Sequence, residues 1–409
     1  MRKILLATTA VAAAALFGPV EAAAQQAPTV RVGGYFRFNY AFTDQDNVVT
    51  QNIREGKSDF AADAEVHVIV EGKTANGLTY GSTIEIQTDL NRGNGTGFSK
   101  TSLDIDEMYM WIASPTAGQL RFGDEDGVVL GAMLTGFVTN FGTGGVDGDA
   151  WDNVIGANNR PSYFAGGGLS DSTKVIYTSP QFFGFDFGAS FAFNNNEGED
   201  SGCDALSISC DRTAAFSYAL GAPRIRNERQ AAVRYRGSFS GVGVQANVGY
   251  IGSDVTANIG GPSAQGLDVY SVGLQATAYG FLVGANYSWG DAQAGLGILN
   301  RPAPGTRLDT RNMKQLFAGA SYTISGLTVG ANFFDVKSAG NQNILTGGRT
   351  DRAWAVGASY TLAPGLQLVA EYISSKKKEG GFDFANGTLG SANNSSEADV
   401  VLLGTRIAF

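Results

Sequence analysis

The C-terminal segment 400–409 alternates strictly between two kinds of side chain. One set of positions is large and mostly apolar, namely Val401, Leu403, Thr405, Ile407 and Phe409. The intervening positions include a glycine, an alanine and an arginine, namely Val400, Leu402, Gly404, Arg406 and Ala408. A period of two places each set on one face of a β-strand. A strand with these two faces suits a wall that has lipid on one side and water on the other.

The N-terminal segment has the parts of a secretory signal. Arg2 and Lys3 precede an apolar run over residues 4–20, and Ala24 stands just before Gln25. The run is alanine-rich and no longer than the apolar part of a signal peptide, which favours a cleaved signal over a membrane anchor. We therefore expect residues 1–24 to be a signal peptide, and residues 25–409 to form a single barrel domain.

Composition excludes several classes of protein. Hydrophobic residues make up 43% of the chain, and no segment after the signal offers the about 18 consecutive apolar residues that a spanning helix needs. Glycine accounts for 56 of 409 residues, about twice its usual share, which favours many strands joined by tight turns. Without residues 1–24 the charge is 27 minus 37, or -10. An acidic chain without a basic run gives no reason to expect nucleic acid as a partner.

Short glycine turns recur between alternating segments. They are Asn76-Gly77, Ala117-Gly118, Phe183-Gly184, Ser240-Gly241, Tyr279-Gly280, Ser325-Gly326 and Pro364-Gly365. Such turns are hairpin signals. The longer polar connections between them are expected at residues 43–57, 90–102, 124–172, 194–226, 252–266, 290–311, 337–350 and 374–398. Seven tight turns, eight long loops and both chain ends on the tight-turn side predict a barrel of sixteen antiparallel strands, all-β in class.

The predicted strands repeat the two-faced pattern. In the first, even positions from Val30 to Phe42 are mostly apolar, whereas odd positions from Arg31 to Asn39 are polar or small. Tyrosine and tryptophan recur at two distances from the turns: Tyr177, Tyr235, Tyr322 and Tyr360 before a turn, and Tyr250, Tyr287, Trp289 and Tyr372 after one. This placement predicts aromatic girdles at the two interfaces of a membrane. A soluble sandwich of this length would be unusually large.

The third long loop, residues 124–172, is much the longest. Loops of this length are usually functional or disordered. Its first part carries apolar side chains such as Val128, Met133, Phe137 and Phe141. We therefore expect this loop to fold back against another part of the protein.

Segments spread along the chain resemble one known family. They are the hairpin at residues 71–81, the segment 118–123 that leads into the third loop, the segment 175–185, and the terminal Phe409. In this order they resemble Gram-negative general diffusion porins of the sixteen-stranded, trimeric kind, nearest to those of alphaproteobacteria. The resemblance implies a homotrimer in the outer membrane, in contact with its lipid and lipopolysaccharide. It also implies that the third loop narrows the lumen, that the assembly machinery recognises the strand ending at Phe409, and that small polar solutes pass.

Strand parity assigns charged residues to the lumen. The predicted lumen cations are Arg31, Arg37, Arg121, Lys174, Arg234, Arg236 and Arg406. The predicted lumen acids are Asp63, Glu65, Glu85, Asp104 and Asp106, to which the third loop adds Asp124 and Asp126. Rings and patches of charge tune channel selectivity. Porins often carry arginines where this chain has Glu65 and Asp106, and residues 136–145 lack acids. With its negative net charge, the channel is expected to prefer cations mildly.

Signals for other chemistry are weak. His67 is the only histidine, so we expect a polar wall residue rather than a base or a metal ligand, and no Gly-x-Ser-x-Gly motif indicates an enzyme. Cys203 and Cys210 are predicted to form a disulfide in the fourth loop of an exported chain. No cofactor is expected, although calcium at loop carboxylates remains open. A substrate-selective channel and an adhesin or receptor barrel are the alternative functions.

Overall fold

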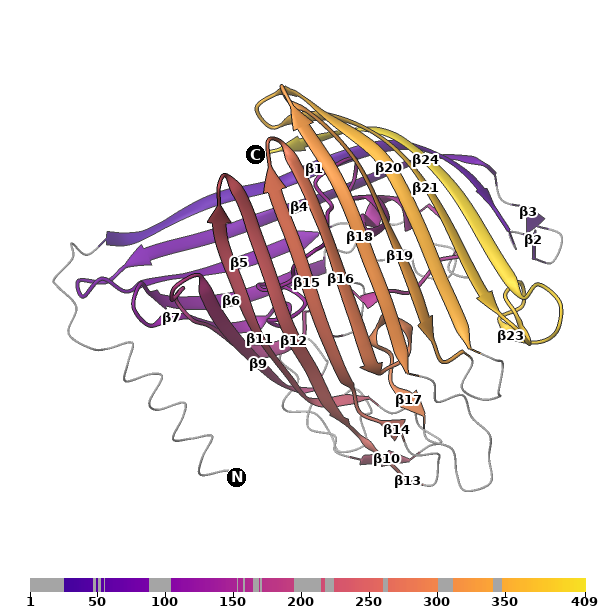
Figure 1. Ribbon diagram of the computed structural model, residues 1–409, viewed down its shortest axis with the longest axis horizontal. Helices are drawn as coiled ribbons and strands as arrows, with labels where there is room; N and C mark the ends of the chain where they lie inside the picture. Colours follow the sequence, from indigo (N-terminus) through magenta and orange to yellow (C-terminus); the bar gives the residue numbers. More distant parts are fainter. Residues whose placement is uncertain are drawn as a thin grey trace.

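Figure 1 shows the fold of the protein in a computed structural model. The structure describes residues 26–46, 49–50, 53–54, 56–87, 104–152, 154–156, 159–164, 169, 171–194, 215–217, 224–259, 264–300, 312–340 and 348–409. The predicted signal peptide, Cys203 and Cys210 lie outside these residues, and so does the side chain of Asp104. The cleavage and the disulfide therefore stay predictions.

Sixteen strands form one closed barrel. They are β1 (Gln26–Gln45), β4 (Ser58–Lys73), β5 (Thr79–Gln87), β6 (Asp104–Ser114), β7 (Gly118–Asp124), β8 (Thr173–Thr178), β9 (Phe185–Asn194), β11 (Ile225–Phe239), β12 (Val242–Val255), β15 (Asp268–Ala278), β16 (Phe281–Asp291), β18 (Met313–Ile324), β19 (Leu327–Ser338), β20 (Arg349–Ala363), β21 (Leu366–Glu379) and β24 (Ser395–Ala408). Each strand pairs antiparallel with its neighbours in this order, and β24 pairs with β1. The predicted sixteen-stranded antiparallel barrel is thus confirmed.

Short elements decorate the connections between these strands. Four small sheets pair β2 (Val49–Thr50) with β3 (Ile53–Arg54), β10 (Ala215–Ser217) with β13 (Ala257–Ile259), β14 (Ala264–Gln265) with β17 (Leu299–Asn300), and β22 (Phe382–Asp383) with β23 (Thr388–Leu389). Single turns of helix occur at η1 (Gly145–Asp147), α2 (Asp149–Asp152) and η4 (Ala294–Leu296). None of the helices in the described part of the chain is long and apolar enough to cross a membrane.

The tight turns and the long connections lie at opposite ends of the barrel (Figure 1). At the turn between β11 and β12, Ser240 has a φ of 49° and Gly241 a φ of 83°. Positive φ at both central residues is the signature of a type I′ turn, whose twist matches that of the flanking strands. The same pattern holds at Tyr279-Gly280 and Ser325-Gly326. The glycines that mark these turns in the sequence are therefore required by the backbone.

The first and last strands close the wall. Phe36 is paired with Ile407, and the register continues in both directions along β1 and β24. At the end of this seam, the amides and carbonyls of Gly34 and Phe409 exchange two hydrogen bonds of 3.1 Å each. The C-terminal segment that alternates so strictly in the sequence is thus the closing strand.

The two faces of the wall differ as strand parity predicts. Outward-facing residues are apolar and exposed, with Val30 and Phe60 about two-thirds exposed (65% and 66%). Inward-facing residues on the same strands are polar and covered, such as Asn39 and Asp63. The apolar core lies inside the barrel, where the third loop packs on the wall and buries Val129, Met133, Phe141 and other residues.

Aromatic side chains form contacts on the outward face at two heights. Toward the long loops, Tyr270 lies 5.3 Å from Tyr250 and 5.9 Å from Trp289 between ring centroids. Near the tight turns, Phe281 and Tyr322 lie 4.5 Å apart. Three of the predicted girdle residues, Tyr250, Trp289 and Tyr322, take part in these contacts. Tyr270 lies at the height near the long loops, because its strand places it between Tyr250 and Trp289.

Candidate functional site: the lumen and the third loop

The third loop lies directly on the lumen face of the wall, where inward-facing glycines leave room for it. A Cβ atom added at Gly319 would come within 2.9 Å of Val138, and one added at Gly284 within 2.7 Å of the carbonyl oxygen of Gly136. At Gly330 the added atom would overlap the ring of Phe141. The same relationship holds for Gly188 with Val128, Gly249 with Val129, and Gly273 with the carbonyl of Thr135. We call these six glycines the glycine track.

Amide side chains between the glycines hold the loop backbone. Asn247 donates from Nδ2 to the carbonyl of Met133 at 2.7 Å, and Asn286 donates to that of Thr135 at 3.0 Å. Asn332 donates to the carbonyl of Val138 at 2.9 Å and accepts from the amide of Val146 at 3.0 Å. Buried backbone groups need such partners, because an unpaired one costs about 1–3 kcal/mol. The polar side chains of the wall thus supply hydrogen-bond partners to the backbone of a loop that forms no β-ladder there.

Glu371 of β21 anchors the end of the track. Its carboxylate accepts hydrogen bonds from the amide of Gly145 at 2.8 Å, and from the amide of Thr143 at 3.2 Å, as well as from the hydroxyl of Thr143. The residue is buried. Several donors directed at one carboxylate stabilise its charged form. Glu371 alternates in step with Val369 and Ile373, which face inward, so the sequence predicts its inward direction. The sequence does not predict that it holds the third loop.

A polar cleft separates the middle of the third loop from the seam of the barrel. It has a volume of about 320 Å³, and loop residues Thr139, Asn140 and Thr143 face it from one side. On the other side lie Tyr35, Arg37 and Arg406. The Tyr35 ring centroid lies 5.5 Å from Cζ of Arg37 and 4.9 Å from Cζ of Arg406. Arg37 also forms an ion pair with Asp63.

The acidic residues gather on the neighbouring strands β4 to β6. A break in the register of β5 and β6 falls between Ile84 and Ile86 of β5. Across it, Ile105 and Met108 both face outward and are exposed, and two residues lie between them. Such a β-bulge carries one extra residue, so Asp106 and Glu107 both lie on the inward side. Simple alternation assigns only Asp106 to the lumen and misses Glu107.

Two of these acids surround the single histidine. His67 lies opposite Glu85 in the pairing of β4 with β5. Its Nε2 atom lies 2.5 Å from Oε1 of Glu65, and its Nδ1 atom lies 3.8 Å from Oε1 of Glu85. Asp106 accepts a hydrogen bond of 2.6 Å from Gln87, which neighbours Glu65 across the strands. Glu65, His67, Glu85, Asp106 and Glu107 together form what we call the acidic patch.

Two predicted lumen cations are tied to the start of the third loop. Arg121 pairs with Glu125 at 2.5 Å. Lys174 faces inward as parity predicts, but it is only 3% exposed, because its ammonium donates to the backbone carbonyls of Glu125 and Leu169. It therefore holds the loop rather than facing open lumen. Asp124 accepts a hydrogen bond from the hydroxyl of Thr173.

Asp126 extends the acidic patch into the third loop. Burial raises its pKa to about 6, whereas Lys174 opposes this rise. The charges of Glu125, Asp106 and Glu228 add to the increase. Asp126 therefore changes its charge in a range of pH close to neutrality.

The remaining predicted cations lie apart from the acidic patch. Arg234 and Arg236 both pair with Asp186 at 2.7 Å, and Arg234 also donates to the carbonyl of Ala132 in the third loop at 2.7 Å. Arg31 lies 4.0 Å from Glu71 and is largely exposed. Asp186 was missed in the sequence, although it alternates with Phe185 and Phe187 and so has inward parity.

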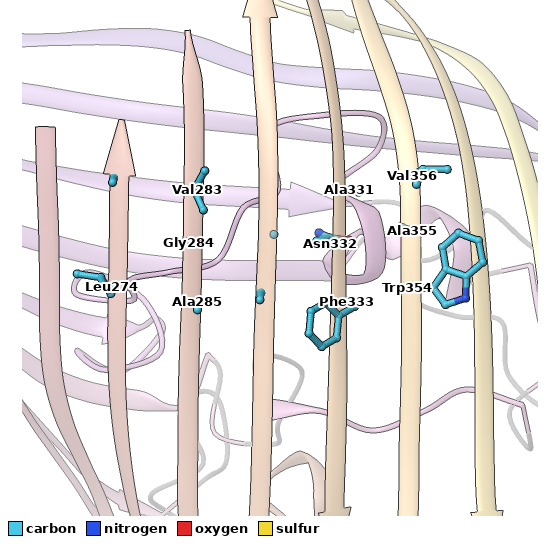
Figure 2. Close-up of a pocket in the computed structure, with 13 residues that line it drawn as sticks. Leu274, Val283, Gly284, Ala285, Ala331, Asn332, Phe333, Trp354, Ala355 and Val356 are labelled. Carbon is cyan, nitrogen blue, oxygen red and sulfur yellow. The ribbon is translucent and has the colours of Figure 1, made fainter. Parts of the chain in front are cut away.

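An apolar groove of about 600 Å³ lies on the other side of the same wall (Figure 2). It crosses β15 to β20, and exposed side chains such as Leu274, Val283 and Trp354 border it. Gly284 and Gly319 of the glycine track form part of its floor. The groove faces away from the lumen, so it does not belong to the site described above.

Comparison with known proteins gives concordant results. The family model described as Gram-negative porin matches residues 7–381. No curated protein sequence matches the chain. Among solved structures, the chain is similar to an anion-selective porin from Comamonas acidovorans, with 14% identity and a TM-score of 0.58, covering 94% of this chain and 100% of the other.

Two further structures have the same fold. One is a loop-deletion mutant of OmpT, an outer membrane protein of Vibrio cholerae, with 13% identity, a TM-score of 0.57 and coverage of 94% of this chain and 100% of the other. Another is a triple mutant of the Rhodopseudomonas blastica porin, with 16% identity, a TM-score of 0.53 and coverage of 93% and 100%. At these identities the structures bear on the fold alone.

Proposed function

This chain belongs to the family of Gram-negative porins, and we propose on this basis that it is a passive, water-filled channel for small hydrophilic solutes and ions. Family membership makes it an outer-membrane channel rather than an enzyme. The observation that carries the finer proposal is the path of the third loop, which crosses the lumen face along the glycine track and leaves a polar cleft beside it. A loop in this position restricts passage by size while keeping water in the lumen.

The proposed selectivity is a mild preference for cations. Glu65 and Asp106 face the lumen beside the third loop, and Asp126 adds a negative charge above pH 6. Arg121 is paired with the carboxylate of Glu125. Lys174 is buried, and its ammonium donates to the main-chain carbonyls of Glu125 and Leu169. The charge of Arg37 is opposed by Asp63. Lumen acids at close range favour cations over anions.

The assembly proposal follows from the family. We propose a homotrimer in contact with outer-membrane lipid and lipopolysaccharide, assembled by machinery that recognises the strand ending at Phe409. The exposed apolar outer face supports contact with lipid and with neighbouring subunits. Cross-linking of the native protein should give trimers, and monomers alone would contradict the proposal.

Single-channel recording in planar bilayers tests the channel proposal. The protein should give ohmic openings in steps of three, without saturation as solute concentration rises, and a salt gradient should give a reversal potential of cationic sign. Silence of the purified, folded protein would contradict the channel. A reversal potential of clearly anionic sign would contradict the selectivity alone.

One observation favours a substrate-selective channel for small anions as a second candidate. In the cleft beside the loop, Arg406 and Arg37 flank Tyr35, and none of the loop residues that line this cleft is acidic. Two guanidinium groups in a cleft form a good site for a carboxylate or phosphate. Conductance that saturates with one organic anion would favour this candidate over general diffusion.

A further inference from the structure

Two carboxylates and one imidazole converge on the lumen face of β4 and β5. Glu65 and His67 are two residues apart on β4, so both point inward, and His67 lies directly opposite Glu85 of β5. One candidate ligand atom from each of the three residues can be chosen so that all lie within 4.8 Å of one another. The three side chains come from two hydrogen-bonded strands, which fix their spacing.

Charge around this group is unbalanced. Among the ion pairs in the described part of the chain, Glu65 and Glu85 are joined to His67 and to no lysine or arginine. Glu65 is also hydrogen-bonded to Glu85 and Tyr35. The nearby cations have other partners, since Arg121 pairs with Glu125 and Arg37 with Asp63. Asp106 and Glu107 both interact electrostatically with Glu85, so acids outnumber bases around this group. A bound cation would neutralise this excess.

We propose that Glu65, His67 and Glu85 bind one divalent transition-metal cation of the zinc class. Imidazole nitrogen with carboxylate oxygen suits zinc, copper or nickel, whereas calcium and magnesium take oxygen ligands. Three protein ligands leave a fourth position for water. The His67 side chain is 27% exposed, so the site is open to ions that enter the lumen. In this proposal the single histidine is a metal ligand, whereas the sequence alone predicts a polar wall residue.

The site has a consequence for the channel. A divalent cation held by Glu65 and Glu85 would reverse the local charge of the acidic patch beside the third loop. Cations that pass through the lumen along the acidic patch would then be repelled by the bound metal ion. Zinc is therefore inferred to lower the cation current, and magnesium at the same concentration to do so much less.

Isothermal titration of ZnCl2 into the untagged, folded barrel in detergent at pH 7 tests binding directly. His67→Gln keeps the formal charge of the neutral imidazole but removes the nitrogen ligand. It should weaken zinc binding by at least about tenfold, because loss of a group that supports a metal site typically costs 10- to 100-fold. Glu71→Gln is the matched control: it removes one acid from the lumen face of β4, outside the group, and should leave zinc affinity unchanged.

Several outcomes would overturn the proposal. Equal zinc affinity of the wild-type protein and His67→Gln would show that binding is merely electrostatic. Equal affinity for MgCl2 and ZnCl2 would show the same, and absence of zinc binding would leave only a hydrogen-bonded network. If His67→Gln does not fold, NMR of the wild-type protein tests the site instead. The ring resonances of its sole histidine should shift when ZnCl2 is added and should not shift with MgCl2. Ring resonances that ZnCl2 leaves unchanged would refute the site. These measurements need no open channel, so they are independent of the proposed transport.

Discussion

Arg37 and Arg406 are directly opposite each other across the seam of the barrel. Both guanidinium groups lie near the ring of Tyr35, whose face attracts cations. Like charges in directly paired positions of a sheet are normally unfavourable. Here Asp63 compensates Arg37, and Arg406 remains exposed toward the cleft beside the third loop. The closing pair of strands therefore also carries the basic side of the lumen.

Removal of the Arg406 charge should raise the preference for cations. Arg406→Gln takes a positive charge from the cleft and leaves Asp63 paired with Arg37. The reversal potential in a salt gradient should shift toward the cation value. Arg352→Gln is the control, because Arg352 has outward parity on β20 and is exposed beside Asp335. Equal shifts for the two variants would argue against a lumen role for Arg406.

A methyl group on the glycine track should push the third loop inward. In Gly330→Ala the new Cβ atom would overlap the Phe141 ring, so we expect lower conductance and a loss of about 1–3 kcal/mol of stability from overpacking. Adding Phe141→Ala should restore the conductance. Gly56→Ala, where nothing lies within 4 Å of the added atom, should match the wild-type protein. Unchanged conductance in Gly330→Ala would place the narrowest passage elsewhere.

Loss of the Glu371 charge should loosen the third loop. Glu371→Gln keeps the shape but can accept only through one oxygen, whereas the carboxylate accepts from Thr143 and Gly145 through both. We expect a cost of about 1–3 kcal/mol, as for hydrogen bonds to charged groups, and more frequent current fluctuations in single-channel records. Glu397→Gln, on the exposed pair with Lys376, serves as the control. Quiet channels in Glu371→Gln would mean that the neighbouring contacts suffice.

Cation preference should fall as the pH drops from 7 to 5. The pKa of Asp126 is raised to about 6, mainly by burial, so its carboxylate is charged above pH 6 and neutral below it. Lys174, Glu125, Asp106 and Glu228 surround it electrostatically. Asp126→Asn should have the low-pH selectivity already at pH 7 and a flatter dependence between pH 7 and pH 5. An identical pH profile in the variant would assign the change to other groups of the acidic patch.

The sign of the linked stability can be stated as well. Because the folded-state pKa of Asp126 lies above its ordinary value of 3.8, folding favours the neutral carboxyl. Its contribution to stability is fully present below pH 4, the unfolded value, and is lost as the pH rises through 6. Wild-type protein should therefore lose more stability than Asp126→Asn between pH 4 and pH 7 in denaturant titrations.

The strands could be predicted from the sequence because their pattern is local. Alternation with a period of two sets the direction of each side chain, and the glycine turns set the ends of the strands. Counting the turns therefore predicts that the last strand closes the barrel against the first, although the register, with Phe36 opposite Ile407, comes from the structure. The inward direction of Glu107 could not be predicted in this way, because a β-bulge shifts the alternation by one residue. Nothing in the sequence of the segment 104–114 indicates the bulge. Asp186 and Glu371 had the correct parity and could have been found.

The contacts of the third loop could not be predicted in this way. The loop has no period of its own, and its partners lie far away in sequence: Thr143 meets Glu371 across 228 residues. The inward glycines were visible as small residues on a polar face, but only the path of the loop shows that they are places of contact. The same applies to His67, whose neighbour Glu85 comes from the pairing of two strands.

The glycine track sets an upper limit on the width of the channel at the third loop. Along the track the loop already rests against the main chain of the wall, and a glycine has no side chain that could be shortened further. Any substitution there can only add atoms and move the loop toward the axis. Substitutions at these six positions can therefore narrow the passage but cannot widen it. A wider passage requires a shorter third loop or smaller side chains on the wall opposite it.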